Sequence, residues 1–312
     1  MRILVTDGME KSAQEKLREM GHEVVEQFYE PEELGKALQD FDAVVVRSKT
    51  KVRANHIDEA LQGKLKLIIR GGVGVDNIDV AYAKEKGIEV RNTPKASSQS
   101  VAELALGHMF SCARYISISG HTMREGKWEK KAYGKGTEVC GKTVGIIGYG
   151  RIGHCLGHMC KALGMEVMAY GAHHEPGTAA DDGTPYVSLD ELFAKSDFIS
   201  LHAPKADGPI VTAENIEKMK DGVIIINNSR GGLINEQDLA DALNSGKVYA
   251  AGLDVVSTEP IKGDNPLLKA KNCIITPHIS WAAQAARQRI MDITVGNIKA
   301  FIEGNPINVV NK

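Results

Sequence analysis

The stretch GIIGYGRIG, residues 145–153, joins an apolar run to a helical pattern. Gly148, Gly150 and Gly153 in it have the spacing G-x-G-x-x-G. Between a strand and a helix, the first glycine permits a tight turn and the second lets backbone approach a pyrophosphate. The third lets helix and strand pack closely. Because the helix N-terminus also offers unpaired N–H groups to an anion, the stretch predicts a dinucleotide site.

Short β-type runs alternate with helical segments on both sides of this loop. The first series extends from RILVTD (2–7) to IEVRN (88–92), and the second from TVGIIGYG (143–150) to CIITP (273–277). Apolar runs such as AVVV are typical of strands that are covered on both faces. Regular alternation of strand and helix indicates parallel sheets. We therefore predict an α/β protein with two doubly wound parallel-sheet domains.

The strand after the glycine loop ends in VMAYGAHHEP, residues 167–176. A carboxylate usually stands at this end, where it holds the adenosine ribose and repels the 2′-phosphate of NADP. Gly171 occupies that place. Losing one charged acceptor costs about 1–3 kcal/mol and removes the main barrier to NADP. His173 and His174 could contact a phosphate weakly or be solvated loop residues, so the sequence favours NAD and leaves NADP open.

Composition limits the classes of partner. The 312 residues carry a net charge of −2, which gives no general attraction to nucleic acid or membranes. No apolar run approaches the roughly 18 residues of a membrane span, and charged residues from Asp7 onward come too early for a signal peptide. Five scattered cysteines without a CxxC pair fit a reducing cytoplasm. His154 and His158 have ligand spacing but no third ligand, so we expect no metal site.

Three polar side chains follow three predicted strands: Arg230 in NNSRGG, Glu259 in GLDVVSTEP and His278 in TPHISW. Ligands of such sheets bind outside the carboxyl ends of the strands, so these groups could converge. A histidine can donate a proton to a reduced carbonyl, and a carboxylate beside it fixes its tautomer. An arginine can grip a substrate carboxylate with two parallel hydrogen bonds. Taken singly, they could equally be a surface charge, a turn residue and a capping residue.

With these motifs, the chain resembles the D-isomer-specific 2-hydroxyacid dehydrogenases over nearly its whole length. The matching stretches include RGGVGVDNID (70–79), GKTVGIIGYGRIG, NSRGGLINE and TPHISW. The resemblance implies a flavodoxin-like substrate domain of residues 1–97 and 283–312, split around a Rossmann-type cofactor domain of residues 98–282. It also implies that an arm of residues 119–142 embraces a second subunit, so a homodimer is expected.

The resemblance further implies roles for individual residues. Arg230 would bind the substrate carboxylate, and Glu259 would pair with His278, the acid/base. The backbone of Val73 and Gly74 would help to hold the same carboxylate.

Contacts to the cofactor are implied in the same way. Asp254 would meet the carboxamide of the nicotinamide. The remaining contacts lie on the glycine loop and after two later strands: Gly148, Gly150, Arg151, Ile152, Gly153, His202, Ala203, Pro204 and Ser229.

The N-terminal region looks most like D-3-phosphoglycerate dehydrogenases, through VVVRSKTKV (44–52) and GKWEKK (126–131). Arg47 and Arg70 would contact a substrate phosphate, although a solvated basic loop is the alternative. Trp281 is closer to hydroxypyruvate and glyoxylate reductases. The leading hypothesis is an NAD(P)-dependent dehydrogenase of D-3-phosphoglycerate. The alternatives are a hydroxypyruvate or glyoxylate reductase and a non-catalytic NAD-sensing regulator similar to corepressors.

Overall fold

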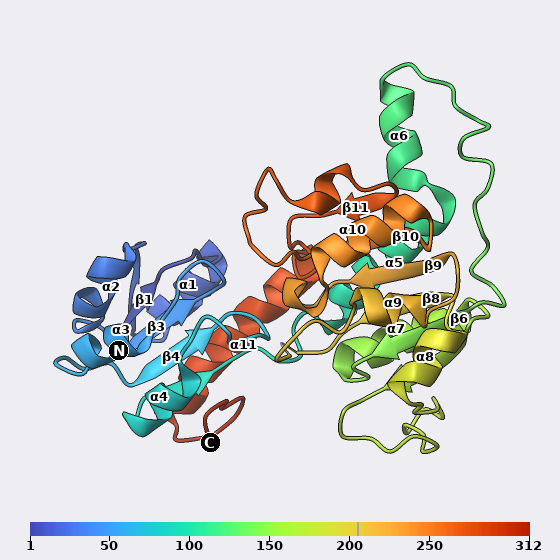
Figure 1. Cartoon of the computed structure of the whole chain (residues 1–312). Helices are drawn as coiled ribbons and strands as arrows, with labels where there is room; N and C mark the ends of the chain where they lie inside the picture. Colours follow the sequence, from blue (N-terminus) through green and yellow to red (C-terminus); the bar gives the residue numbers. More distant parts are fainter. Residues whose placement is uncertain (205) are drawn as a thin grey trace. The chain divides into compact units, whose positions relative to one another are not determined.

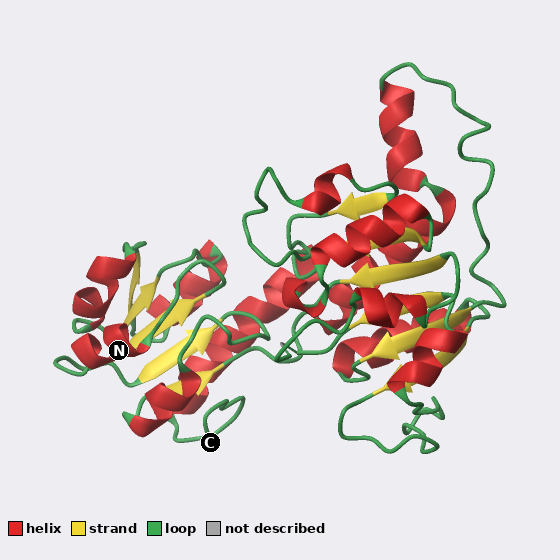
Figure 2. Cartoon of the chain, in the orientation of Figure 1, coloured by secondary structure: helices red, strands yellow, loops and turns green. Residues whose placement is uncertain are grey.

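The computed structural model describes residues 1–204 and 206–312. The chain divides into two compact units, the first formed by Met1–Ser97 with Ala282–Lys312 and the second by Ser98–Trp281. Each unit has its own parallel sheet flanked by helices (Figures 1 and 2). The predicted α/β class with two parallel-sheet domains is confirmed.

The first unit has five strands in the order β2-β1-β3-β4-β5, all parallel. The strands are β1 (Arg2–Val5), β2 (Glu23–Glu26), β3 (Ala43–Val46), β4 (Leu67–Arg70) and β5 (Glu89–Arg91). The helices are α1 (Lys11–Glu19), α2 (Pro31–Leu38), α3 (Ala54–Ala60), α4 (Val80–Glu85) and α11 (Gln284–Ile302). All four residues of β3 are buried, as its apolar run AVVV predicts.

The helix α11 belongs to the first unit although it lies near the end of the chain (Figure 1). Lys16 of α1 forms an ion pair with Asp292 of α11 at 3.0 Å. The buried guanidinium of Arg91 donates to the carbonyl oxygens of Asn297 and Asn305, each at 3.0 Å. These contacts join α11 to α1 and to β5.

The second unit has six parallel strands in the order β11-β10-β9-β8-β6-β7. The strands are β6 (Thr143–Ile147), β7 (Glu166–Tyr170), β8 (Phe198–Leu201), β9 (Val223–Asn227), β10 (Val248–Leu253) and β11 (Cys273–Ile275). The α-helices are α5 (Ser98–Arg114), α6 (Ile116–Arg124), α7 (Arg151–Ala162), α8 (Leu189–Lys195), α9 (Ala213–Glu217) and α10 (Glu236–Ser245). The order reverses between β6 and β8, which is where this type of sheet binds ligands.

Alternating residues of these strands enter two different cores. Ile225 of β9 packs with the side chains of α8, α9 and α10. Its neighbours Ile224 and Ile226 pack with those of α5 and α7. Both faces of the sheet are therefore covered by helices (Figure 1), and the polar groups that follow the strands remain at its ends.

The expected arm begins inside a helix. Helix α6 continues to Arg124, and the chain from residue 125 to residue 142 returns without a further helix or strand. Figure 1 shows α6 projecting from the second unit. The part played by residues 119–142 in a dimer stays a prediction. Within the described residues, no helix is long and apolar enough to cross a membrane.

Candidate active site

Two of the three glycines in the loop after β6 occupy positions that a side chain would disturb, and the third leaves its backbone open. Gly148 has a φ of +93°, and a Cβ atom on it would lie 2.7 Å from the backbone nitrogen of Ala203. A Cβ atom on Gly153 would lie 2.6 Å from the carbonyl oxygen of Gly148. Gly150 faces open space, with no atom of the described residues within 4 Å of such a Cβ. The turn, the open backbone and the close helix packing suit a pyrophosphate.

Helix α7 begins at this loop and has Gly150 as its N-cap. A glycine cannot cap the first N–H groups of the helix with a side chain, so these groups are left for an anion. The next residue, Arg151, is exposed and adds positive charge, and Ile152 is half-buried. The residues present therefore fit the diphosphate of a dinucleotide.

The end of β7 lacks the usual acid, and an aromatic pair occupies that region. A Cβ atom on the half-buried Gly171 would lie 2.7 Å from Cδ2 of His174. The ring of His174 stacks on Tyr186, with 4.1 Å between ring centroids and an interplanar angle of 5°. His173 is exposed. Of the two histidines, His174 is thus packed on the protein, and it fills the space where a side chain at position 171 would lie.

Residues after β8 border the glycine loop, since a Cβ atom on Gly148 would lie 2.7 Å from the carbonyl carbon of His202. His202 donates its backbone N–H to the carbonyl oxygen of Ile147 at 2.7 Å, and its Nε2 lies 2.9 Å from Oγ of Ser200. Its buried Nδ1 has no hydrogen-bond partner among residues 1–204 and 206–312. Burial lowers the pKa of His202 to about 4, so the ring is neutral at pH 7. This orphaned atom at the reversal of the strand order is a further feature that suits a bound ligand.

The other predicted cofactor contacts differ in their exposure and in their hydrogen bonds within the protein. Ala203 is half-buried and Pro204 is exposed. Ser229 donates its hydroxyl to Oδ1 of Asn227 at 2.9 Å, and its backbone N–H donates to the same atom at 3.1 Å. Ser229 is thereby fixed in the turn that leads to Arg230.

Two members of the predicted trio are in direct contact. Nδ1 of His278 lies 2.8 Å from Oε2 of Glu259, and the two side chains are 37% and 41% exposed, so a substrate can reach them. Burial alone would raise the pKa of Glu259, but the hydrogen bond and charge of His278, with the charge of Arg230, lower it overall. The Arg230 side chain donates to the carbonyl oxygen of Ser229 at 2.8 Å. The structure therefore joins Glu259 to His278 and places the charge of Arg230 close to this pair.

Asp254 is fully buried and holds the loop that carries His278. Its Oδ1 accepts the hydroxyl of Thr276 at 2.6 Å and the backbone N–H of Ile279 at 2.9 Å, while Oδ2 accepts the N–H of Ser280 at 2.8 Å. The backbone N–H of His278 donates to the carbonyl of Asp254 at 2.9 Å. These bonds hold His278 at a φ of +51°, which is uncommon for a residue other than glycine. The expected contact of Asp254 with a nicotinamide stays a prediction.

The first unit contains the residues expected to bind the distal end of the substrate. Arg47 follows β3, and its backbone N–H donates to Oδ2 of Asp7 at 2.7 Å. The same carboxylate accepts the backbone N–H and the hydroxyl of Thr50, at 3.0 and 2.6 Å. The side-chain amide of Asn77 donates to the carbonyl oxygens of Arg47 and Thr50, both at 2.7 Å. The loop that carries Arg47 is therefore held from two sides.

Arg70 ends β4 and folds back over the turn that follows. Its Nη1 donates to the carbonyl of Gly71 at 2.9 Å, and a Cβ atom on Gly72 would lie 1.2 Å from that nitrogen. Gly72 has a φ of +156°. Val73 and Gly74 follow in the same turn and are half-buried. The turn thus brings the Arg70 guanidinium over the backbone of Gly72, immediately before the predicted carboxylate contacts.

A family model described as "D-isomer specific 2-hydroxyacid dehydrogenase, NAD binding domain" matches residues 106–280, more than half of the chain. The chain belongs to this family. The predicted membership is confirmed, and the protein is an NAD-dependent dehydrogenase of D-2-hydroxyacids.

Two relatives and one solved structure illustrate how similar this dehydrogenase is to known members. The hydroxypyruvate reductase of Blautia hydrogenotrophica is 54% identical over 77% of this chain and 76% of its own. The D-3-phosphoglycerate dehydrogenase of Methanocaldococcus jannaschii is 44% identical over the whole of this chain, which spans 59% of that relative. The crystal structure of the TT0316 protein from Thermus thermophilus has a TM-score of 0.90 at 33% identity, covering 99% of this chain and 100% of that one.

His108 is a buried residue of the dehydrogenase that the sequence analysis missed. It lies on α5, with Nε2 3.3 Å from Oγ1 of Thr276 and Nδ1 3.2 Å from the side-chain amide of Asn228. Burial lowers its pKa. It therefore links the turn before Arg230 to the loop before His278. A polar residue within the apolar stretch ALGHMF was the signal that could have found it.

The hydrogen bonds of His108 indicate its tautomer. Because the Thr276 hydroxyl donates to Asp254, its oxygen is free to accept from Nε2 of the imidazole. The atom of the Asn228 side chain that lies 3.2 Å from Nδ1 is Oδ1, and its Nδ2 has no partner among the described residues, so exchanging the two ends of the amide would give Nδ1 a donor. His108, Thr276 and Asp254 thus form a directed chain that ends at the His278 loop. Within the described residues, no group of three or more potential ligands could hold a metal ion.

Proposed function

We propose that this dehydrogenase interconverts hydroxypyruvate and D-glycerate with NAD(H), using Arg230, Glu259 and His278. The contact of 2.8 Å between Glu259 and His278 carries the assignment of the acid/base. The pKa of Glu259 is lowered, so this carboxylate stays ionised and can accept the hydrogen bond that fixes the tautomer of the imidazole.

The proton moves at the other ring nitrogen of His278. Because Nδ1 faces Glu259, the Nδ1 proton is held there and Nε2 is left for the substrate. In the direction of reduction, Nε2 donates its proton to the substrate oxygen as the alcohol forms, and in oxidation it takes that proton back. The bonds from Asp254 to the loop fix the direction of the ring relative to the strand ends.

Arg230 would bind the substrate carboxylate through two parallel hydrogen bonds and polarise the adjacent carbonyl. When bound, the nicotinamide cofactor supplies or accepts the hydride. Its diphosphate would be held by the backbone of Gly148 and Gly150 and the start of α7, with Arg151 nearby. The lack of an acid at Gly171 leaves NADP(H) as a second cofactor.

The choice of an unphosphorylated three-carbon acid rests on two features. Trp281 donates its indole N–H to the carbonyl of His278 at 3.0 Å, so the residue typical of hydroxypyruvate reductases supports the acid/base loop. In the first unit, the carboxylates of Asp7 and Glu10 act on Arg47 and offset its charge. D-3-phosphoglycerate is the second candidate, because Arg47 and Arg70 would still suit a phosphate.

The test follows NADH absorbance with hydroxypyruvate, glyoxylate and 3-phosphohydroxypyruvate as separate substrates. We expect the highest kcat/KM with hydroxypyruvate and a fall of about 100-fold or more in kcat for His278→Ala, with NADH binding retained. Thr178→Ala, a change at an exposed residue outside the site, is the control. A wild-type protein that binds NADH but reduces none of the three acids would support the non-catalytic regulator instead.

We also propose that the enzyme is a homodimer joined through the arm of residues 119–142. Three apolar residues on α6 and the returning chain support this: Ile116, Met123 and Trp128 are 57%, 49% and 78% exposed. Such exposure is typical of an interaction surface. Light scattering should give twice the chain mass, and Trp128→Glu should shift the population toward monomer.

A further inference from the structure

The end of β7 lies next to the glycine loop of the second unit and carries no acid. The backbone N–H of Gly148 donates to the carbonyl oxygen of Tyr170 at 2.8 Å, so the strand ends where the loop turns. Gly171 follows, at the place where a carboxylate usually binds the 2′-hydroxyl of the adenosine ribose. A cofactor whose diphosphate lies on the loop would therefore bring its ribose to this strand end.

The imidazole of His174 stands in the space that a side chain at position 171 would use. Its Cδ2 would lie 2.7 Å from a Cβ atom on Gly171. The backbone N–H of His174 donates to the carbonyl oxygen of Gly171 at 3.0 Å, which closes a tight turn and folds the ring back toward the strand end. The residue stays exposed, so a ligand at the strand end can reach the ring.

A buried tyrosine fixes the orientation of this imidazole. The ring of His174 stacks on that of Tyr186, which is only 4% exposed. Tyr186 donates its backbone N–H to the carbonyl oxygen of Thr178 and accepts the N–H of Gly177, both at 2.8 Å. Within the described part of the chain, neither ring nitrogen of His174 has a hydrogen-bond partner. The stack therefore holds the ring in place and leaves its polar atoms for a ligand.

The glycine loop itself supports this stack. Tyr149, between the first two glycines, donates its hydroxyl to Oδ2 of Asp182 at 2.8 Å. Lys161 of α7 pairs with the same carboxylate at 3.3 Å. The ring of Tyr149 meets the ring of Tyr186 edge to face, with 6.3 Å between the centroids. Two tyrosines thus connect the loop that would hold the diphosphate to His174.

We propose that His174 is a specificity-determining residue of the cofactor site, which replaces the missing acid and binds the 2′-phosphate of NADP(H). An acid at this strand end would repel that phosphate, whereas an imidazole donates one N–H when neutral and two when protonated. The bond to the uncharged 2′-hydroxyl of NAD(H) is weaker than the bond to a charged phosphate. The inference rests on the proposed seat of the diphosphate at Gly148 and Gly150 and is independent of the substrate acid.

The experiment measures the Kd of NADPH and of NADH by fluorescence titration, without substrate, in wild type and His174→Ala. We expect the ratio of the Kd for NADPH to the Kd for NADH to rise about fivefold or more in the variant, because a hydrogen bond to a charged group is lost. His173→Ala is the matched control, since it removes the neighbouring exposed histidine and leaves the stack intact. It should leave the ratio unchanged.

A second variant separates the N–H groups from the shape of the ring. His174→Phe keeps an aromatic ring that can stack on Tyr186 and has no N–H donor. It should raise the ratio as much as His174→Ala does. An unchanged ratio in either His174 variant, or an equal rise in His173→Ala, would overturn the role of His174.

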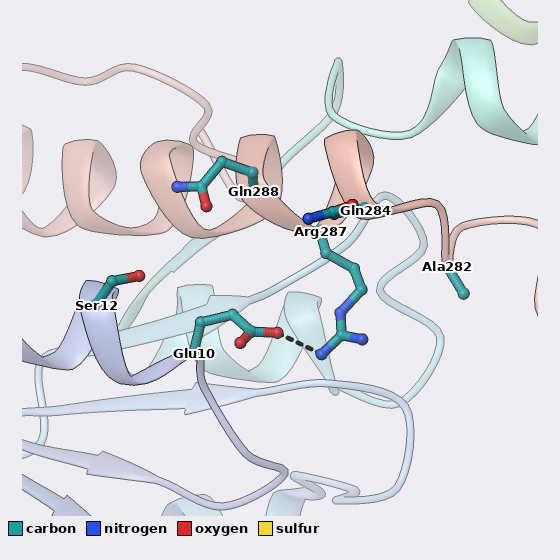
Figure 3. A pocket seen from close by; sticks show the side chains of 6 residues that line it. All are labelled: Glu10, Ser12, Ala282, Gln284, Arg287 and Gln288. Atoms are coloured by element: carbon teal, nitrogen blue, oxygen red, sulfur yellow. Dashed lines mark hydrogen bonds and ion pairs between the residues drawn. The ribbon is translucent and has the colours of Figure 1, made fainter.

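A phosphate could also lodge in the first unit, where a pocket lies at the starts of α1 and α11. Arg287 lines this pocket and forms an ion pair with Glu10 (Figure 3). Adenosine 2′,5′-bisphosphate and adenosine 5′-monophosphate differ only in the 2′-phosphate, so the difference between their shifts of the thermal midpoint reports on that group. Arg287→Gln should keep the wild-type difference, and His174→Ala should lose most of it. The opposite result would place the phosphate in the first unit and refute the inference.

The two levels of proposal fail in different ways. A wild type that binds neither dinucleotide would refute the proposed diphosphate seat and, with it, the role of His174. Binding of NADH with one and the same ratio in all variants would refute the role of His174 alone.

Discussion

Replacing Asp254 with asparagine tests whether this carboxylate holds the loop of His278 in its active position. The carboxylate accepts three hydrogen bonds from that loop, two of them from the backbone N–H groups of Ile279 and Ser280. Asparagine offers only one acceptor oxygen, and its amide nitrogen would face one of these N–H groups. At least one backbone donor therefore loses its partner in a fully buried place.

The size of the effect comes from the lost bond and the stranded donor. A hydrogen bond to a charged group contributes about 1.5–3 kcal/mol, and a buried donor left unsatisfied costs about 1–3 kcal/mol. Since the asparagine keeps part of the network, we expect a loss of about 2–4 kcal/mol in the free energy of unfolding. A displacement of His278 by about 1 Å would lower kcat/KM by about 100-fold.

The assay combines urea unfolding with steady-state reduction of hydroxypyruvate and titration of NADH fluorescence. Asp221→Asn is the matched control, because its carboxylate is 91% exposed and pairs only across the surface with Lys247. It should change the free energy of unfolding by less than about 1 kcal/mol. An Asp254→Asn enzyme of unchanged stability and kcat, with only NADH binding weakened, would refute the anchoring role and favour a contact with nicotinamide.

Three further outcomes are expected. His108→Leu should lower kcat/KM by roughly tenfold and leave the Kd of NADH unchanged, and His108→Gln should restore part of the lost kcat/KM. Unchanged kinetics of the leucine variant would exclude a positioning role. Gly171→Asp, which requires the ring of His174 to move, should favour NAD over NADP, and an equal preference would place the strand end away from the ribose. Burial lowers the pKa of His202 to about 4 from 6.5, so the unfolded chain alone gains this proton between those values. The thermal stability of the wild type should therefore fall as the pH decreases from 6.5 to 4, and that of His202→Gln should fall less steeply. Identical slopes of stability against pH in the two proteins would contradict this.

Local patterns in the sequence were sufficient for the two sheets and for placing polar groups at the ends of their strands. The apolar run AVVV predicts a strand covered on both faces, and β3 is fully buried. Glu259 and His278 were expected to converge because each follows a strand, and the family resemblance implied their pairing. They follow β10 and β11, which prove to be parallel neighbours. Their pairing depends on strand order, which the alternation of strands and helices already restricts.

Other features depend on packing between distant segments. His108 acquires its role only because α5 lies against β10, where a side chain at Gly252 would meet its Cβ at 2.7 Å. The ion pair of Glu10 with Arg287 joins residues 277 positions apart. No local pattern marks either partner, because a charged residue at the start of a helix is as compatible with a solvated surface as with an ion pair.

The sequence by itself determined the α/β class, the glycine loop and the polar residues that follow the strands, since strand periodicity and turn chemistry act between near neighbours. The tertiary structure alone decided which partners the polar side chains find. Asp254 accepts hydrogen bonds from the His278 loop, and Glu10 forms an ion pair with Arg287. A buried or partly buried charge must be compensated by the groups that packing places beside it.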